Sequence, residues 1–356
     1  MKKKLFCSLL LCLCFLTACS REQQVSGEII ERSMKEDSGI VSFVIQTDSG
    51  KEIGILMTEE TWVTPWADGM IGDDFKFEEQ DGIRVSVSYD RTTRSLVTKS
   101  GNEIPAYDAK RVEIREVRMP NQTTLSDGTC VDVWQGSNYT QYELADGTEL
   151  LREYRASGPA NHYVVGIENF DELSEPAKEN VLRFYEEQGL LYNTQDELEQ
   201  AYAEYLVCGA ESNFSYYKVE QQISPTASNE RILCFLTSVT LPIDEKNYTE
   251  LRLGAVFDRK TGEHLNPWDL FSCDEQTAKQ AILDLAGVTD PVLRAEMEAA
   301  FQPEYIILFP NDLEVSFPMG TLPCQEYSSG LGLDYDDRLR EIMYDWAIPD
   351  SADQSA

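Results

Sequence analysis

The sequence predicts a multidomain protein in which an N-terminal all-β barrel precedes an α+β part, where helices pack on an antiparallel sheet. Alternating apolar and polar residues dominate the first third of the chain, and helix-capping signals appear only further along. A length of 356 residues suits two or three domains. With 42% hydrophobic and 10% aromatic residues, the chain has enough apolar material to form folded cores.

The N-terminus has the pattern of a secretion signal. Three lysines precede an apolar run from Leu5 to Leu16, which is shorter than the roughly 20 residues of a membrane-spanning helix. The run ends in the lipobox Leu16-Thr17-Ala18-Cys19. We therefore expect residues 1–18 to be a signal peptide cleaved after Ala18. Cys19 would carry a lipid that anchors the protein to the outer face of the cell membrane, and residues 19–26 would form a tether. The alternative is an ordinary signal peptide with a chance cysteine.

The charge of the chain restricts its partners. The formal net charge is -33, and loss of the three signal lysines would make the mature chain more negative still. Such a surface repels nucleic acid phosphates and anionic membrane surfaces, so we exclude both as binding partners. It would attract a cationic protein or peptide. The alternative is that the acidity reflects only the general protein composition of the source organism.

The cysteines give no metal site. Removal of the signal leaves Cys19 and five further cysteines, at spacings that suit no zinc ribbon. Export permits disulfides, and the pairing stays open. We expect most of the five to be small buried apolar residues: Cys130, Cys208, Cys234, Cys273 and Cys324.

Residues 27–119 are expected to form the β-barrel domain. Five runs have strand character, and a longer insert, Thr58 to Gln80, separates the third from the fourth and is expected to contain a helical turn. The clearest alternation is in the fourth run. The five runs are Gly27 to Arg32, Ile40 to Gln46, Lys51 to Met57, Ile83 to Tyr89 and Ala109 to Val117.

This arrangement, with the phrase DGIRVSVSYD…IPAYDAKRVEI, resembles the small OB-fold domains of other exported lipoproteins. OB-folds often bind oligonucleotides or sugars, and the negative charge here excludes the first. Trp62 and Trp66 are therefore candidate residues for stacking on a sugar. The alternative is that both tryptophans are buried in the domain.

Residues 120–213 are expected to contain β-hairpins followed by a helical pair. Two Asp-Gly turns, at Asp127-Gly128 and Asp146-Gly147, separate short alternating runs. Ser174 with Pro176 predicts the start of the first helix. A capping box, Thr194 to Glu197, predicts the start of the second.

Residues 214–348 are expected to form an α+β domain, followed by a flexible tail at 349–356. Three strand-like runs come first, from Tyr216 to Asp258. The capping box Ser272 to Glu275 predicts a helix, and a second helical stretch ends near Phe301. A hairpin across Pro310 and a closing helix from Arg338 to Trp346 complete the domain.

The region from about Phe214 to Trp346 resembles a known family, domain of unknown function 3298 (DUF3298). This is the extracellular domain of lysozyme-sensing anti-sigma factors and of some peptidoglycan deacetylases. The matching phrases are LGAVFDRKTGEHLNPWDLF and YIILFPNDLEVSFPMGTLPCQEYSSG, and Tyr327 in the second is a candidate ligand contact. The resemblance implies an α+β fold. Some family members bind lysozyme, but the sequence contains neither the transmembrane helix of the anti-sigma factors nor a deacetylase domain.

Catalytic chemistry is not indicated. His162 and His264 are the only histidines, and no nucleophile elbow or metalloprotease motif accompanies them. Asp334, Asp336 and Asp337 suit a cation only if they are not simply the beginning of a helix. We expect no cofactor, no metal and no enzyme activity. The predicted function is that of an envelope lipoprotein that binds a ligand or partner, such as a cell-wall glycan. The alternatives are a carboxylate-dependent cell-wall hydrolase and a binder of lysozyme or cationic peptides.

Overall fold

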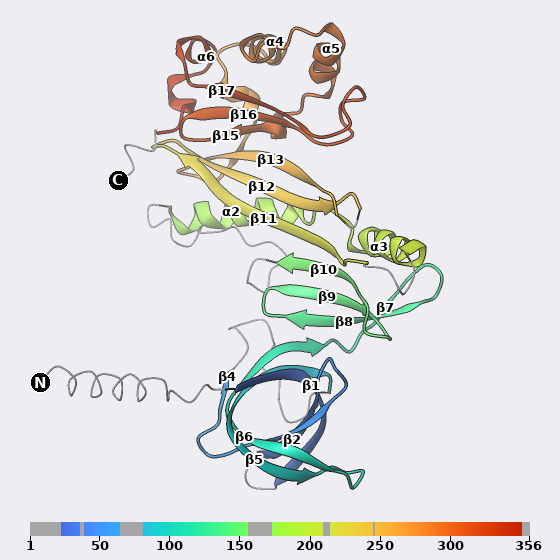
Figure 1. Ribbon diagram of the computed structural model, residues 1–356. Coiled ribbons are helices and arrows are strands. Elements are labelled where there is room, and N and C mark those ends of the chain that lie inside the picture. Colours follow the sequence, from blue (N-terminus) through green and yellow to red (C-terminus); the bar gives the residue numbers. More distant parts are fainter. Residues whose placement is uncertain are drawn as a thin grey trace, which may run out of the picture. The chain divides into compact units, whose positions relative to one another are not determined.

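The computed structural model describes residues 23–35, 39–64, 81–155, 173–208, 214–244 and 246–350. The chain divides into two compact units, Met1–Arg118 and Met119–Ala356 (Figure 1). Ala18, Cys19, Trp66 and His162 lie outside the described residues. None of the helices in the described ranges is long and apolar enough to cross a membrane.

The N-terminal unit is a closed β-barrel (Figure 1). Its main strands run in the order β1-β2-β3-β6-β5, and β5 pairs again with β1. The β3–β6 pair is parallel and the other four are antiparallel. The strands are β1 (Gln23–Lys35), β2 (Gly39–Gln46), β3 (Glu52–Leu56), a short β4 (Trp62–Thr64), β5 (Ile83–Val97) and β6 (Glu103–Arg118).

Apolar side chains at alternate positions of the strands fill the interior of the barrel. Phe43, Ile45, Val85, Val87 and Val112 are all nearly inaccessible and belong to one core. In the described part of this region, the predicted all-β character is therefore confirmed. Two strands are longer than expected, because β5 and β6 continue past register shifts near Tyr89 that break the apolar-polar pattern. Strand β1 begins at Gln23, inside the segment expected to be a tether.

The C-terminal unit contains a long mixed sheet. Its strands run in the order β8-β9-β10-β11-β12-β13-β14, with β7 beside β8, and only the β10–β11 pair is parallel. The predicted hairpins and the later strands thus share one sheet. The strands are β7 (Thr123–Thr124), β8 (Cys130–Gly136), β9 (Tyr139–Leu144), β10 (Glu149–Arg155), β11 (Tyr217–Ser228), β12 (Ile232–Pro242), β13 (Tyr248–Asp258) and β14 (His264–Leu265).

Two helices pack on this sheet, α2 (Glu175–Gln188) and α3 (Thr194–Cys208). Ser174 caps α2 as predicted, because its hydroxyl accepts a hydrogen bond from the Ala177 N–H. The predicted capping box at Thr194 is wrong. Asn193 accepts from the Gln195 N–H at 2.9 Å, while the Thr194 hydroxyl donates to the carboxylate of Glu153.

A second sheet has the order β15-β16-β17, and three helices cover one of its faces (Figure 1). Asp274 caps the first of these helices, so the capping box predicted from Ser272 is displaced by two residues. The predicted closing helix is a short α6 followed by a separate 3-10 turn at Asp345–Ala347. The elements are β15 (Ile306–Leu308), β16 (Asp312–Phe317), β17 (Ser329–Asp334), α4 (Glu275–Leu285), α5 (Pro291–Ala300) and α6 (Asp337–Ile342).

The burial of the cysteines differs from the prediction. Only Cys234 is buried, on the inward face of β12, and burial raises the pKa of its thiol. Cys130 and Cys324 are exposed, and Cys208 and Cys273 are half-buried. All five are free thiols, so the prediction that most are buried is wrong.

Candidate functional site

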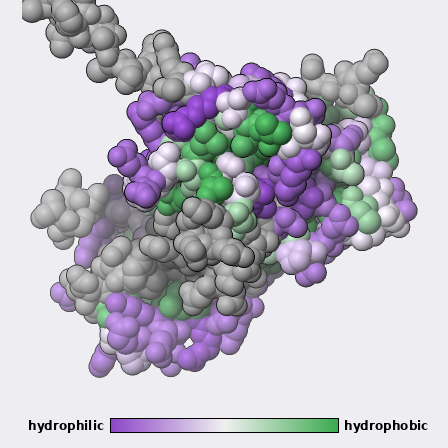
Figure 2. Space-filling view, turned by 90° about the horizontal axis from the view of Figure 1, so that it is seen from below, coloured by the Kyte–Doolittle hydropathy of each residue, from purple (hydrophilic) through white to green (hydrophobic). Residues whose placement is uncertain are grey.

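The predicted ligand contacts within the described ranges are exposed. Trp62 is 61% exposed on β4, and the Arg111 guanidinium lies 5.2 Å from the centre of its ring. Tyr327 is 63% exposed, two residues before β17. The surface seen in Figure 2 is largely hydrophilic, and apolar side chains gather in a few places. The alternative interpretation, in which both tryptophans are buried, is wrong for Trp62, while Trp66 lies outside the described residues.

The N-terminal unit has a hollow of about 230 Å³ between the β1–β2 hairpin and the end of β5. We call it the hairpin hollow. Strands β1 and β2 contribute Arg32 and Phe43, which face each other in register. Trp62 is not part of it. The hollow is lined by Glu31, Arg32, Ser33, Ser42, Phe43, Val44, Leu96, Val97, Thr98 and Lys99.

Hydrogen bonds fix the turn beside the hollow. Both carboxylate oxygens of Glu31 accept from the Lys99 N–H, at 2.8 and 2.9 Å, which ties the β5–β6 turn to β1. The buried Thr98 hydroxyl accepts from the Asn102 N–H at 3.1 Å within the turn. The hollow is therefore bounded by two hairpins that are fixed to each other.

The hairpin hollow combines charged residues, among them the cationic Arg32 and Lys99, with apolar groups. The Arg32 side chain is only 13% exposed and lies 3.6 Å from Asp81. Burial lowers the pKa of Arg32, and the charge of Asp81 partly offsets this effect. Phe43 is almost fully buried, whereas Val97 is 65% exposed. These groups suit a ligand that offers both an apolar face and polar hydrogen-bonding atoms.

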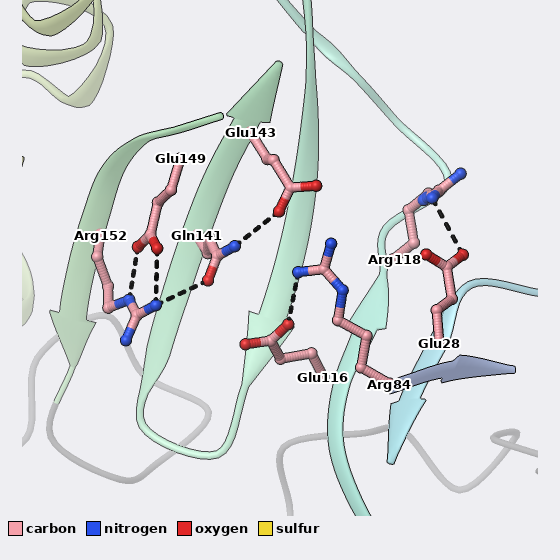
Figure 3. Close-up of polar contacts among 8 residues, drawn as sticks. All are labelled: Glu28, Arg84, Glu116, Arg118, Gln141, Glu143, Glu149 and Arg152. Atoms are coloured by element: carbon pink, nitrogen blue, oxygen red, sulfur yellow. Dashed lines mark hydrogen bonds and ion pairs between the residues drawn. The ribbon is translucent and has the colours of Figure 1, made fainter. Parts of the chain in front are cut away.

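Figure 3 shows a chain of polar contacts on β9 and β10. Arg152 donates to both oxygens of Glu149, at 2.7 and 2.9 Å, and to Gln141 at 2.9 Å, and Gln141 donates to Glu143. Burial alone would lower the pKa of Arg152, but the hydrogen bond and charge of Glu149 outweigh it and raise the pKa. Because these groups satisfy one another, we interpret the chain as structural rather than as a ligand site.

The barrel unit contains two comparable pairs, also drawn in Figure 3. Arg84 lies 2.9 Å from Glu116, whose side chain is 11% exposed, and Arg118 lies 3.2 Å from Glu28. Arg84 and Glu116 are register partners on the paired strands β5 and β6, whereas Arg118 on β6 reaches across β5 to Glu28 on β1. The Arg84–Glu116 pair stabilises the register of β5 and β6, and in both pairs opposite charges are matched.

The acidic run at the end of β17 forms a helix cap. The Asp336 carboxylate accepts from the backbone N–H groups of Arg338 and Leu339 and also binds the Arg338 guanidinium at 2.8 Å. These hydrogen bonds hold the pKa of Asp336 below its ordinary value. The interpretation of this run as a helix start is confirmed. In the part of the chain that the structure describes, no three His, Cys, Asp or Glu side chains are grouped to hold a metal ion.

His264 lies in an aromatic environment. Its ring stacks on Phe184, with centroids 4.4 Å apart, and meets the edge of Phe257 at 5.5 Å. Burial lowers its pKa below 6.5, and the carboxylate of Glu304 opposes this shift. The ring is held by packing from α2 and β13, with no nucleophile placed beside it by these contacts.

This environment predicts how His264 titrates. A proton NMR titration should give a midpoint below 6.5, with His264→Gln assigning the resonance. Because the folded pKa is depressed, the stabilisation is present above the unfolded pKa and is lost as the pH falls through the folded value. A midpoint at or above 6.5 would contradict the packing described.

Comparisons with known proteins identify no close relative. No family model matches the chain, and no curated protein matches it. A solved DUF3298 family structure from Bacteroides fragilis is similar with a TM-score of 0.34 and 9% identity, covering 64% of this chain and 92% of that one. One from Pseudomonas aeruginosa has a TM-score of 0.28 and 13% identity, covering 66% and 96%. Both belong to the family whose resemblance was predicted for the region from about Phe214 to Trp346.

The hairpin hollow was not predicted from the sequence, because the β1–β2 hairpin and the end of β5 that line it are far apart along the chain. The contact between Glu31 and Lys99 joins residues separated by 68 positions. Trp62 drew attention through its residue type, although its ring lies on β4 away from the hollow's lining.

Proposed function

We propose that this chain is a lipid-anchored protein on the outer face of the cell membrane, whose N-terminal barrel binds a cell-wall glycan without turning it over. The lipobox ending at Cys19 supports the anchor. The acidic composition favours a glycan over an oligonucleotide.

The observation that carries the binding proposal is the strand order of the barrel. Five long strands close as first-second-third-fifth-fourth, with the third and fifth parallel. This order supports an OB-type barrel, a class that binds oligosaccharides near the loops after its first and fourth strands. The hairpin hollow lies next to the corresponding segments, the β1–β2 hairpin and the β5–β6 turn. Arg32 would donate to acetamido or carboxyl oxygens, and Val97 would contact a sugar face.

Binding can be tested with soluble peptidoglycan fragments and N-acetylglucosamine oligomers, by calorimetry on the full chain. Arg32→Gln removes a charged hydrogen-bond donor and should weaken binding roughly ten- to a hundredfold, since such bonds contribute about 1.5–3 kcal/mol. Val97→Asp should weaken it as well. Trp62→Ala is the matched control and should bind like the parent.

The outcomes separate the candidate sites and functions. If Trp62→Ala abolishes binding while Arg32→Gln does not, the site is on β4 and the hairpin hollow is not used. If the fragments are cleaved during the experiment, the chain is a hydrolase. Fatty-acid labelling of the parent and of Cys19→Ala tests the anchor separately, and equal labelling would exclude it.

A further inference from the structure

Strand β17 is an unprotected sheet edge. Within the described ranges it pairs only with β16, in a regular register from Phe317 opposite Ser329 to Asp312 opposite Asp334. Its sequence, SGLGLD, contains no proline, lysine or bulge. Proteins usually block exposed edges with these features, because unpaired backbone groups recruit further strands.

The open edge presents specific peptide groups. The Tyr335 N–H donates to the Asn311 carbonyl, so these two residues are a hydrogen-bonded pair. In an antiparallel ladder hydrogen-bonded pairs alternate with non-bonded pairs, so every second residue of β17 counted back from Tyr335 bonds to β16. The backbone N–H and C=O groups of Leu331 and Leu333 therefore form hydrogen bonds with β16. Those of Gly330 and Gly332 point away from β16. Among the described residues, no other hydrogen bond involves these two glycines. Both are exposed, and no heavy atom lies within 4 Å of the position that a Cβ would take.

Acidic and aromatic groups flank this edge. Glu326 and Asp334 are exposed near its two ends, and Asp337 is exposed just beyond. Tyr327 is 63% exposed, and an accessible aromatic ring can attract a cation. A second copy of this chain would add a charge of -33 and its own Glu326 and Asp334 to the same edge. Repulsion disfavours that occupant, and the same charges favour a basic one.

We propose that β17 binds an extended cationic peptide segment by strand addition. The peptide backbone would pair with Gly330 and Gly332, which provides affinity independent of sequence. Lysine or arginine side chains would reach Glu326, Tyr327 and Asp334. This surface belongs to the C-terminal unit and takes a different ligand from the hairpin hollow, so it adds to the proposed function and does not depend on it.

The first test removes the outward N–H groups. Gly330→Pro and Gly332→Pro delete one outward donor each and leave the bonds to β16 in place, because these residues do not donate to β16. The probe is an octapeptide of alternating lysine and valine, titrated against the full chain. Each proline variant should bind about fivefold more weakly, whereas the controls Gly330→Ala and Gly332→Ala, which keep the N–H, should bind like the parent.

The second test changes the peptide instead of the protein. An octapeptide that is N-methylated at every residue keeps its charge but has no backbone N–H to donate from either of its edges, so its binding should be strongly weakened. Equal binding of the methylated peptide would show simple charge attraction and overturn the proposal. Parent-like binding by both proline variants would overturn it too, as would self-association of the chain with no affinity for the peptide.

Discussion

Replacing Gly254 by alanine is expected to prevent the C-terminal unit from packing normally. Gly254 lies in β13, where β15 crosses the long sheet, and a Cβ there would overlap the backbone carbonyl of Ile306. A rigid backbone group cannot move aside as a flexible side chain can. We expect a loss of at least about 3 kcal/mol in the free energy of unfolding, beyond the usual cost of one extra methyl group in a core.

The measurement is urea unfolding followed by circular dichroism, and the control is Gly332→Ala. That substitution makes the same chemical change at a position with no heavy atom within 4 Å of the new Cβ, so its unfolding midpoint should match the parent. If Gly254→Ala unfolds at the same urea concentration as Gly332→Ala, then β15 does not contact β13 as described.

The contact at Gly254 illustrates what sequence patterns could and could not predict. Alternation identified the strands, because a half-buried strand must place every second residue in the core. The alternation did not predict where β15 crosses β13, because that contact is possible only where Gly254 has no side chain. The parallel β10–β11 pair was equally hidden, because its partners are separated by two helices and more than fifty residues.

Helix-capping and strand patterns in the sequence gave wrong predictions where contacts with distant residues use the same polar groups. Thr194 resembles a helix cap, yet its hydroxyl donates to Glu153, and Asn193 caps α3 instead. Strand β17 was not predicted because its glycines have low strand propensity. The segment forms a strand because it pairs with β16, although its own residues do not favour one. The exposure that makes this edge a candidate site therefore follows from topology, as does the hairpin hollow.

Glu153 is expected to be the polar side chain on which the C-terminal unit depends most. It is fully buried, although it lies on β10 among apolar residues. One carboxylate oxygen accepts from Tyr192 at 2.5 Å and from Thr194 at 3.3 Å, and the other accepts from Tyr142 at 3.3 Å. These bonds join the segment before α3, the start of α3 and strand β9 to one carboxylate.

Glu153→Ala should lower the free energy of unfolding by about 3–5 kcal/mol, because it leaves three hydroxyl groups without their acceptor and creates a cavity. Glu153→Gln keeps the shape and one acceptor oxygen, so it should cost less. Glu179→Ala, an exposed glutamate on α2, is the control and should change stability by less than about 0.5 kcal/mol.

A double-mutant cycle with Tyr192→Phe tests whether the carboxylate acts through this hydrogen bond. If it does, the two substitutions should not be additive, because removal of either partner already breaks the bond. Additive losses would mean that Glu153 stabilises the unit through other contacts, and a Glu153→Ala protein as stable as the parent would exclude the role altogether. A buried acceptor that joins β9, β10 and the beginning of α3 explains why the helix starts at Thr194 although the side chain of that residue is not its cap.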